Sequence, residues 1–125
     1  MALLMQTSAE TQPVSQLETA TDEEIIESVL RECAQFYASK EARTLTIFDR
    51  PNGQFLLMDE GWQDFKHILR VWLYVELRDG KFWIQKDGTE DGVAVDLLEA
   101  GIPKDRIVLA FQHPNRRQYS DFAAA

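Results

Sequence analysis

The chain has 125 residues and a mass of 14.4 kDa, which suffices for one domain with a real core. Hydrophobic residues make up 45% of it and charged residues 27%, so the composition excludes wholesale disorder and a fibrous protein. Thirteen Lys and Arg oppose twenty-one Asp and Glu, giving a formal net charge of -8. That sign disfavours a protein that neutralises many DNA phosphates by itself.

Cysteine usage and hydropathy favour a soluble, cytoplasmic protein. Cys33 is the only cysteine, so neither an intramolecular disulfide nor a cysteine-cluster zinc site can form, which is compatible with a reducing compartment. The start Met1-Ala2-Leu3-Leu4-Met5 is too short for a signal peptide, and no run of about eighteen apolar residues follows. We therefore expect no membrane segment and no contact with a membrane.

The N-terminal part divides into a tail and a helix. Residues 1–20 show no sustained hydrophobic period, and ordering them would cost entropy with little burial, so we expect a disordered tail. Thr21 and Glu24 then have the spacing of a capping box, which predicts a helix over residues 22–39. Its apolar positions are Ile25, Ile26, Val29, Leu30, Cys33, Phe36 and Tyr37.

The middle of the chain has the pattern of β-strands. A strand from Arg43 to Phe48 ends at the turn cluster of residues 49–53, and Phe55 to Met58 should be the returning strand. A longer strand is predicted from His67 to Arg78. One of its faces is uniformly aliphatic and is expected to face the core: Leu69, Val71, Leu73, Val75 and Leu77.

The opposite face of this long strand is a candidate protein interface. Alternation places an aromatic and charged mixture on it, namely Arg70, Trp72, Tyr74 and Glu76. Aromatic and arginine side chains are enriched at interfaces. The mixed face therefore predicts contact with a partner, and a second copy of the chain is one candidate.

The following segment predicts a hairpin, a short helix and a last strand. Asp79-Gly80 favours a type I′ turn leading into a strand from Lys81 to Gln85, antiparallel to the long one. A short amphipathic helix follows, and Gly101 suits its left-handed C-terminal cap, with Pro103 just beyond. The run from Ile107 to Phe111 lacks alternation, which predicts a strand inside the sheet.

These elements predict a single α+β domain over residues 21–125. Its sheet should have about five mostly antiparallel strands, packed with the N-terminal helix and the second short helix.

The loop from Asp87 to Gly92 has two readings, a calcium loop or a capped helix start. Calcium binding is disfavoured because Thr89 stands at the third loop position and Leu98 at the twelfth, where an acid or amide and a bidentate glutamate are needed. As a helix start, Asp87 or Thr89 would accept orphan amide hydrogen bonds. Gly88 and Gly92 would supply unusual backbone angles or close approach.

Catalytic and metal patterns are missing from the sequence. His67 and His113 are the only histidines and cannot form a three-ligand zinc site without carboxylates. No nucleophile elbow and no phosphate-binding loop occurs. We expect no cofactor, no metal and no catalytic residue.

A basic cluster lies near the C-terminus. It consists of Lys104, Arg106, His113, Arg116 and Arg117. These residues are candidate phosphate contacts on an otherwise acidic protein, and the alternative is a solvated face.

From Lys81 onward the chain has a distinctive ordered series of residues, which begins with the signature residues Trp83, Asp87, Gly88, Thr89, Glu90, Gly92, Gly101 and Pro103 and continues with Phe111, Pro114, Arg117, Tyr119 and Phe122. In this series the chain resembles the XisI family, the excision controlling factor of the fdxN element in cyanobacteria. The resemblance covers most of residues 22–125.

This resemblance implies a non-enzymatic accessory factor in site-specific excision of a DNA element. The family implies a recombinase and a companion protein of the XisH family as partners, with DNA contacted only indirectly or weakly. Two alternatives stay open. One is direct DNA binding through the C-terminal basic cluster, and the other is an antitoxin-like inhibitor whose acidic surface sequesters a basic partner.

Overall fold

A computed structural model describes residues 19–125, so the tail expected over residues 1–20 lies outside the described residues except for its last two positions. In chain order the elements are α1 (Asp22–Phe36), β1 (Ala42–Asp49), β2 (Gln54–Gln63), β3 (Lys66–Arg78), β4 (Lys81–Asp87), α2 (Val93–Glu99), η3 (Lys104–Arg106), β5 (Ile107–Val108) and α3 (Pro114–Arg117). The strands form one sheet in this order, antiparallel from β1 to β4, with β5 parallel to β4. The predicted α+β class with a mostly antiparallel sheet is confirmed.

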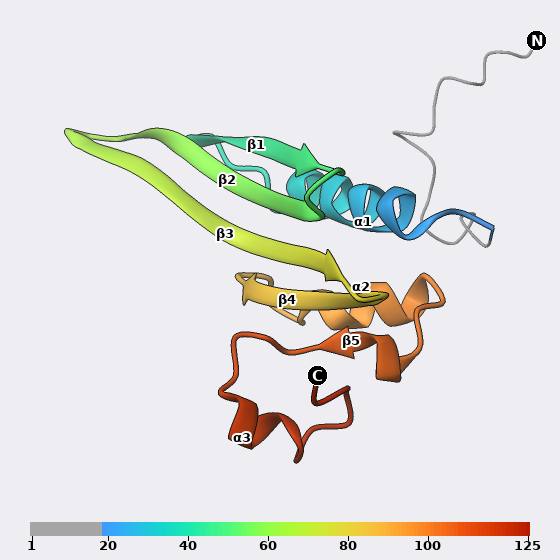
Figure 1. Ribbon diagram of the computed structural model, residues 1–125. Coiled ribbons are helices and arrows are strands. Elements are labelled where there is room, and N and C mark those ends of the chain that lie inside the picture. Colours follow the sequence, from blue (N-terminus) through green and yellow to red (C-terminus); the bar gives the residue numbers. More distant parts are fainter. Residues whose placement is uncertain (1–18) are drawn as a thin grey trace, which may run out of the picture.

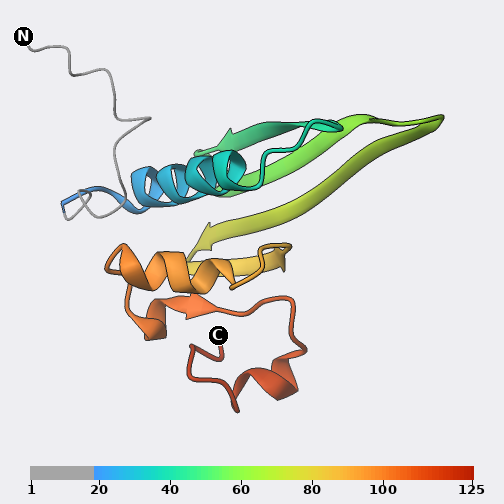
Figure 2. The ribbon, with the colours of Figure 1, turned by 180° about the vertical axis from the view of Figure 1, so that it is seen from behind.

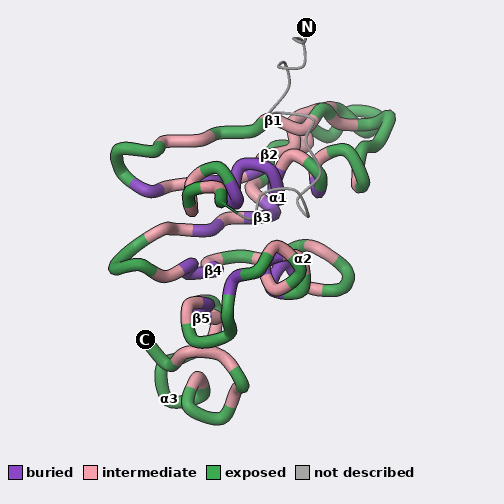
Figure 3. Tube along the Cα trace, turned by 90° about the vertical axis from the view of Figure 1, so that its right-hand side faces the viewer, coloured by how far each residue is buried: buried purple, intermediate pink, exposed green. Residues whose placement is uncertain are grey.

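The molecule has two layers. Helices α1 and α2 lie side by side against one face of the sheet, which is seen from behind in Figure 2 and edge-on in Figure 3. No element within residues 19–125 covers the other face of β1, β2 and β3, which Figure 1 presents to the viewer. We call this uncovered surface of β1 to β3 the open face. None of the helices among these residues is long and apolar enough to cross a membrane.

Helix α1 begins where the sequence predicts and ends three residues earlier. The Thr21 hydroxyl accepts from the Glu24 amide at 3.2 Å, and the Thr21 amide donates to the Glu24 carboxylate at 3.0 Å, completing the capping box. Ile26 and Leu30 are fully buried against the sheet, each worth about 1.5–3 kcal/mol of stability. The helix ends at Phe36, and the C-cap residue Tyr37 packs its ring edge-on against Trp72.

A β-bulge in β3 overturns the expectation of one uniformly aliphatic core face. Leu57 pairs with Leu73 but the next residue, Met58, pairs with Val71. Trp72 is therefore an extra residue that has no counterpart on β2 in the strand register. One extra residue reverses the faces of everything beyond it. Leu73, Val75 and Leu77 therefore face the core. Val71 and Leu69, on the other side of the bulge, lie on the open face.

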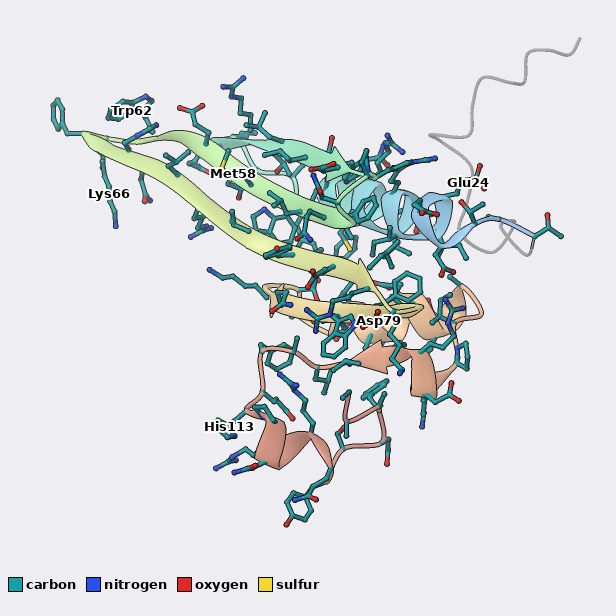
Figure 4. The ribbon with its side chains drawn as sticks, in the orientation of Figure 1. Glu24, Met58, Trp62, Lys66, Asp79 and His113 are labelled. Atoms are coloured by element: carbon teal, nitrogen blue, oxygen red, sulfur yellow. The ribbon has the colours of Figure 1, made fainter. Side chains whose placement is uncertain are left out.

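Strand β2 is longer than the predicted Phe55 to Met58 because it continues into a projecting hairpin. Beyond Met58 it pairs with β3 as far as Gln63, although this stretch lacks a β-favouring composition. The paired ends project from the sheet, with β1 alongside β2 as far as Gly61 and only two strands beyond it, and Figure 4 labels Trp62 and Lys66 near the tip. We call residues 59–70 the arm.

The two predicted backbone signals at turns are confirmed. Asp79 and Gly80 have φ values of 53° and 74°, as a type I′ hairpin requires. Gly101 has φ 98°, and the Ile102 and Gly101 amides donate to the carbonyls of Leu97 and Leu98 at 3.0 Å each. This is a Schellman motif that ends α2.

The last strand does not lie inside the sheet, so that prediction is wrong. β5 is two residues long and occupies the sheet edge, although Ile107 and Val108 are fully buried. Ile107 packs in the main core, and the C-terminal segment covers the outer edge of β5, where Val108 forms a bridge with Ala123. The apolar run without alternation correctly indicated that β5 is covered. The cover on its outer edge is the C-terminal segment, whereas the prediction required another strand of the sheet.

The connection between β4 and α2 is organised by Asp87. Its Oδ1 accepts from the amide and hydroxyl of Thr89, and its Oδ2 accepts from the Val93 amide at 2.8 Å. The Thr89 hydroxyl in turn accepts from the Gly92 amide at 3.1 Å, and Gly92 has φ 93°. The carboxylate therefore satisfies an orphan amide of the helix start, and the loop has the geometry of a cap.

Replacing Asp87 by Ala should lower the free energy of unfolding by about 2–3 kcal/mol, because three hydrogen bonds to a charged acceptor are lost. Urea denaturation followed by circular dichroism measures the effect. Asp91→Ala, an exposed carboxylate of the same loop, is the matched control and should change stability by less than about 0.5 kcal/mol. Equal effects of the two substitutions would show that the cap is not important.

Candidate functional site

The four residues predicted to share one face of β3 do not share it. Arg70 lies opposite Asp59 of β2 in the strand register, on the same side of the sheet as the helices, and is exposed. Trp72 is 9% exposed, meets the Tyr37 ring at 5.7 Å and donates its indole N–H to Asp59 Oδ1 at 2.9 Å. Both residues are on the opposite side from Tyr74 and Glu76, because the bulge falls between them. The expected mixed patch is therefore corrected to two separate surfaces.

Tyr74 and Glu76 lie on the open face and are tied to their neighbours. The Tyr74 hydroxyl donates to the side-chain oxygen of Gln54. The Glu76 carboxylate accepts from Gln54, Gln85 and Arg78, each at 3.2 Å. Polar groups at this end of the open face are satisfied within the chain.

The remainder of the open face is apolar, which the sequence did not indicate. Residues paired directly across neighbouring strands share a face, so the register defines two rows. The rows are Leu45, Met58 and Val71, then Ile47, Leu56 and Tyr74. All six are partly or fully exposed, and Ile47 reaches 41%. The uncovered sheet thus presents a continuous apolar band of Leu45, Met58, Val71, Ile47 and Leu56, which ends at the ring of Tyr74.

The arm extends this band and holds a paired carboxylate, Glu60. Leu69 and Trp62 are 58% and 60% exposed, and the Trp62 ring stacks on His67 at 4.6 Å. Glu60 accepts from His67 and Arg43 at 2.9 Å each. These two hydrogen bonds hold the pKa of Glu60 below its usual value, so the carboxylate stays ionised and paired.

Negative charge is concentrated in the helical layer. Residues 22–36 and 87–99 together carry ten carboxylates and one arginine, and we call this part the acidic layer. Residues 42–86, which form β1 to β4, carry six carboxylates and seven Lys or Arg. The net charge of -8 therefore arises from the side of the molecule that faces away from the open face (Figure 2).

A pocket of about 290 Å³ lies in the acidic layer between α1 and the loop before α2. Its lining includes Glu32, Cys33, Tyr37, Asp91 and Asp96. The Cys33 thiol donates to Asp96 Oδ2 at 3.7 Å, and burial followed by the Asp96 charge raises the pKa of Cys33 to about 12. Burial also raises the pKa of Asp96. A thiol that remains protonated is a poor nucleophile, so the pocket does not support thiol chemistry.

Metal chemistry has no support among the described residues either. Within residues 19–125 no group of three His, Cys, Asp or Glu side chains is placed to hold a metal ion.

The C-terminal basic cluster is largely used inside the fold. Arg117 donates to the carbonyls of Gln112 and Ala110 at 3.0 and 3.1 Å, and His113 Nδ1 accepts from the Asn115 amide at 3.1 Å. Figure 4 shows His113 at the start of α3, away from the sheet. Arg116 is exposed.

The other two cations of the cluster contact the body of the protein. Arg106 donates to the Gly80 carbonyl and pairs with Asp22, while Lys104 lies 3.9 Å from Asp121. The five residues therefore do not form one free phosphate-binding patch.

The signature residues from Trp83 to Pro103 also have structural roles. Trp83 is 8% exposed beneath the Arg78 guanidinium at 3.9 Å, and the Glu90 amide donates to the Tyr37 hydroxyl at 2.9 Å. The Gly88 amide donates to the Trp72 carbonyl at 2.6 Å, where a Cβ on Gly88 would lie 2.7 Å from the same oxygen. Pro103 precedes η3 as its N-cap residue.

The two-layer fold of a mostly antiparallel sheet and two helices on one face is that of XisI-like proteins. A crystal structure of a XisI-like protein from Anabaena variabilis ATCC 29413 superposes with a TM-score of 0.77 and 31% identity, covering 82% of this chain and 95% of that one. The crystal structure of fdxN element excision controlling factor XisI from the same organism gives a TM-score of 0.68 and 30% identity, covering 81% and 92%.

The sequence model of the XisI protein family matches residues 17–124. The chain therefore belongs to the XisI family, as the residues from Lys81 onward indicated. Comparison with curated protein sequences gives no match.

The buried thiol gives a direct chemical prediction. Iodoacetamide at pH 8.5 should alkylate Cys33 at least tenfold more slowly in the native protein than in urea, as mass spectrometry will report, because the folded thiol stays protonated. The raised folded-state pKa stabilises the protein fully below the ordinary value of 9.0, and this contribution is lost as the pH rises toward about 12. Equal alkylation rates in both states would contradict the burial of the thiol.

Arg117 and Arg116 should differ in their effect on stability. Arg117→Ala removes two hydrogen bonds to carbonyls and should lower the free energy of unfolding by about 1–2 kcal/mol. The exposed Arg116→Ala should stay within about 0.5 kcal/mol of the parent. Thermal or urea unfolding compares the two, and a larger loss from Arg116 than from Arg117 would overturn this assignment.

Proposed function

We propose that this protein is a non-enzymatic accessory factor in the site-specific excision of a DNA element, acting in the cytoplasm through a protein partner. The observation that carries the proposal is membership of the XisI family together with a solved relative described as the fdxN element excision controlling factor.

The charge distribution favours a basic partner. Carboxylates concentrated on one side of a protein raise the association rate with a cationic surface and disfavour anionic ones. A protein that contacts DNA phosphates has such a cationic surface. We propose that the acidic layer binds a DNA-contacting protein of the excision apparatus, either a XisH-like companion or the recombinase. Sequestration of the basic protein, as by an antitoxin, would use the same contact.

Co-expression with a XisH-like protein tests the proposal. The two should co-elute in gel filtration at about 10 µM and low salt, with binding weakened at 0.5 M salt because surface charges are then screened. Glu90→Lys combined with Glu99→Lys reverses two exposed charges of the acidic layer and should weaken binding at least tenfold. Glu41→Lys combined with Asp121→Lys makes the same change in net charge outside that layer and should have little effect.

Three outcomes would count against this assignment. Separate elution of the two proteins would refute the companion, and equal weakening by both double variants would refute the acidic layer as the contact. A mobility shift of bare DNA by this protein alone, abolished by Arg116→Ala, would favour direct DNA binding through the C-terminal segment instead.

A further inference from the structure

We propose that the open face binds a second copy of this chain, giving a two-fold dimer in which the two sheets pack face to face. This inference goes beyond the proposed function, because it concerns a different surface from the acidic layer. It explains why aliphatic side chains stand on the solvent side of the sheet.

The apolar band is too continuous for an ordinary solvated sheet face. On an antiparallel sheet with one side in water, the outward positions are normally polar. Here the outward rows at the centre of β1, β2 and β3 are aliphatic, and they are followed along the arm by Leu69 and Trp62. Contiguous exposed apolar surface of this kind marks an interaction site.

The size of the open face matches what a stable dimer needs. Three strands spaced about 4.8 Å apart, each about 33 Å long as for the ten residues of β2, span roughly 500 Å² in projection. Accessible surface exceeds projected area because side chains stand up from the sheet. The face is therefore of the order of the ~800 Å² that each partner contributes to a standard interface.

Charge selects a second copy as the occupant. Two molecules of net charge -8 repel each other unless they meet through a surface that lacks excess negative charge. The section that forms β1 to β4 has nearly equal numbers of acids and bases, and Glu60 and Glu76 are already paired within the chain. With the open faces together, the two acidic layers point away from each other and the repulsion is smallest.

The same balance disfavours a basic partner at this face. A neutral, internally paired surface gives no electrostatic preference for a cationic protein, whereas the acidic layer does. An isologous contact also requires a self-complementary patch, which an apolar band with paired charges at its ends provides. Both acidic layers remain free in such a dimer, so it could carry one basic partner on each side.

Light scattering coupled to gel filtration tests this directly. The full chain should show twice the mass of 14.4 kDa at 100 µM, and raising the salt from 50 to 500 mM should leave the dimer intact. Ile47→Lys places a charge in the apolar band of the open face, on the edge strand β1, and should raise the dimer dissociation constant at least tenfold. Val95→Lys is the matched control, since this β-branched residue of α2 is 43% exposed against 41% for Ile47, and it should leave the dimer unchanged.

A second substitution on the open face separates loss of the dimer from loss of folding. Leu69→Lys changes a side chain of the arm that is 58% exposed, so the core is untouched, and it should also weaken the dimer at least tenfold. Circular dichroism confirms that each variant is folded. A monomer at 100 µM would overturn the proposal, and so would a dimer that both open-face variants leave unchanged. Loss of the dimer with binding of the basic partner retained would support it, because the two surfaces are then independent.

Discussion

The extra residue at Trp72 is the constraint on which the rest of the structure depends. The indole N–H is bonded to Asp59 and the Trp72 carbonyl accepts from the Gly88 amide, so the bulge is held from β2 and from the loop after β4. With this register, Leu73 and Val75 enter the core under α1. The same register places Val71 and Leu69 outward, so this bulge decides which side chains of β3 enter the core and which lie on the open face.

Close approach at the bulge also explains why part of the family signature is glycine. A side chain on Gly88 would collide with the Trp72 carbonyl, and Gly92 needs a left-handed backbone conformation to start α2. Asp87 between the strand and these glycines satisfies the helix start. The signature residues therefore hold β4, the bulge and α2 together, and the surfaces available to partners lie elsewhere.

Separation of charge from apolar surface gives the protein two different sides. Carboxylates gather on the helices, whereas the uncovered sheet is aliphatic with its charges paired. The two proposed contacts use these two sides separately, with a basic protein on the acidic layer and a second copy on the open face. Arg117 of the C-terminal segment belongs to neither surface, because it is bonded to backbone carbonyls and stabilises its own segment.

The sequence by itself determined the features that depend on a few neighbouring residues. The capping box at Thr21, the Asp79-Gly80 turn and the Gly101 cap each follow from contacts within one turn, and the family followed from the ordered matches after Lys81. Only the tertiary structure decided the register of β3, the edge position of β5 and the composition of the open face. Alternation assumes an uninterrupted strand, and the bulge that breaks it is fixed by Asp59 and Gly88, which are distant from Trp72 in the sequence.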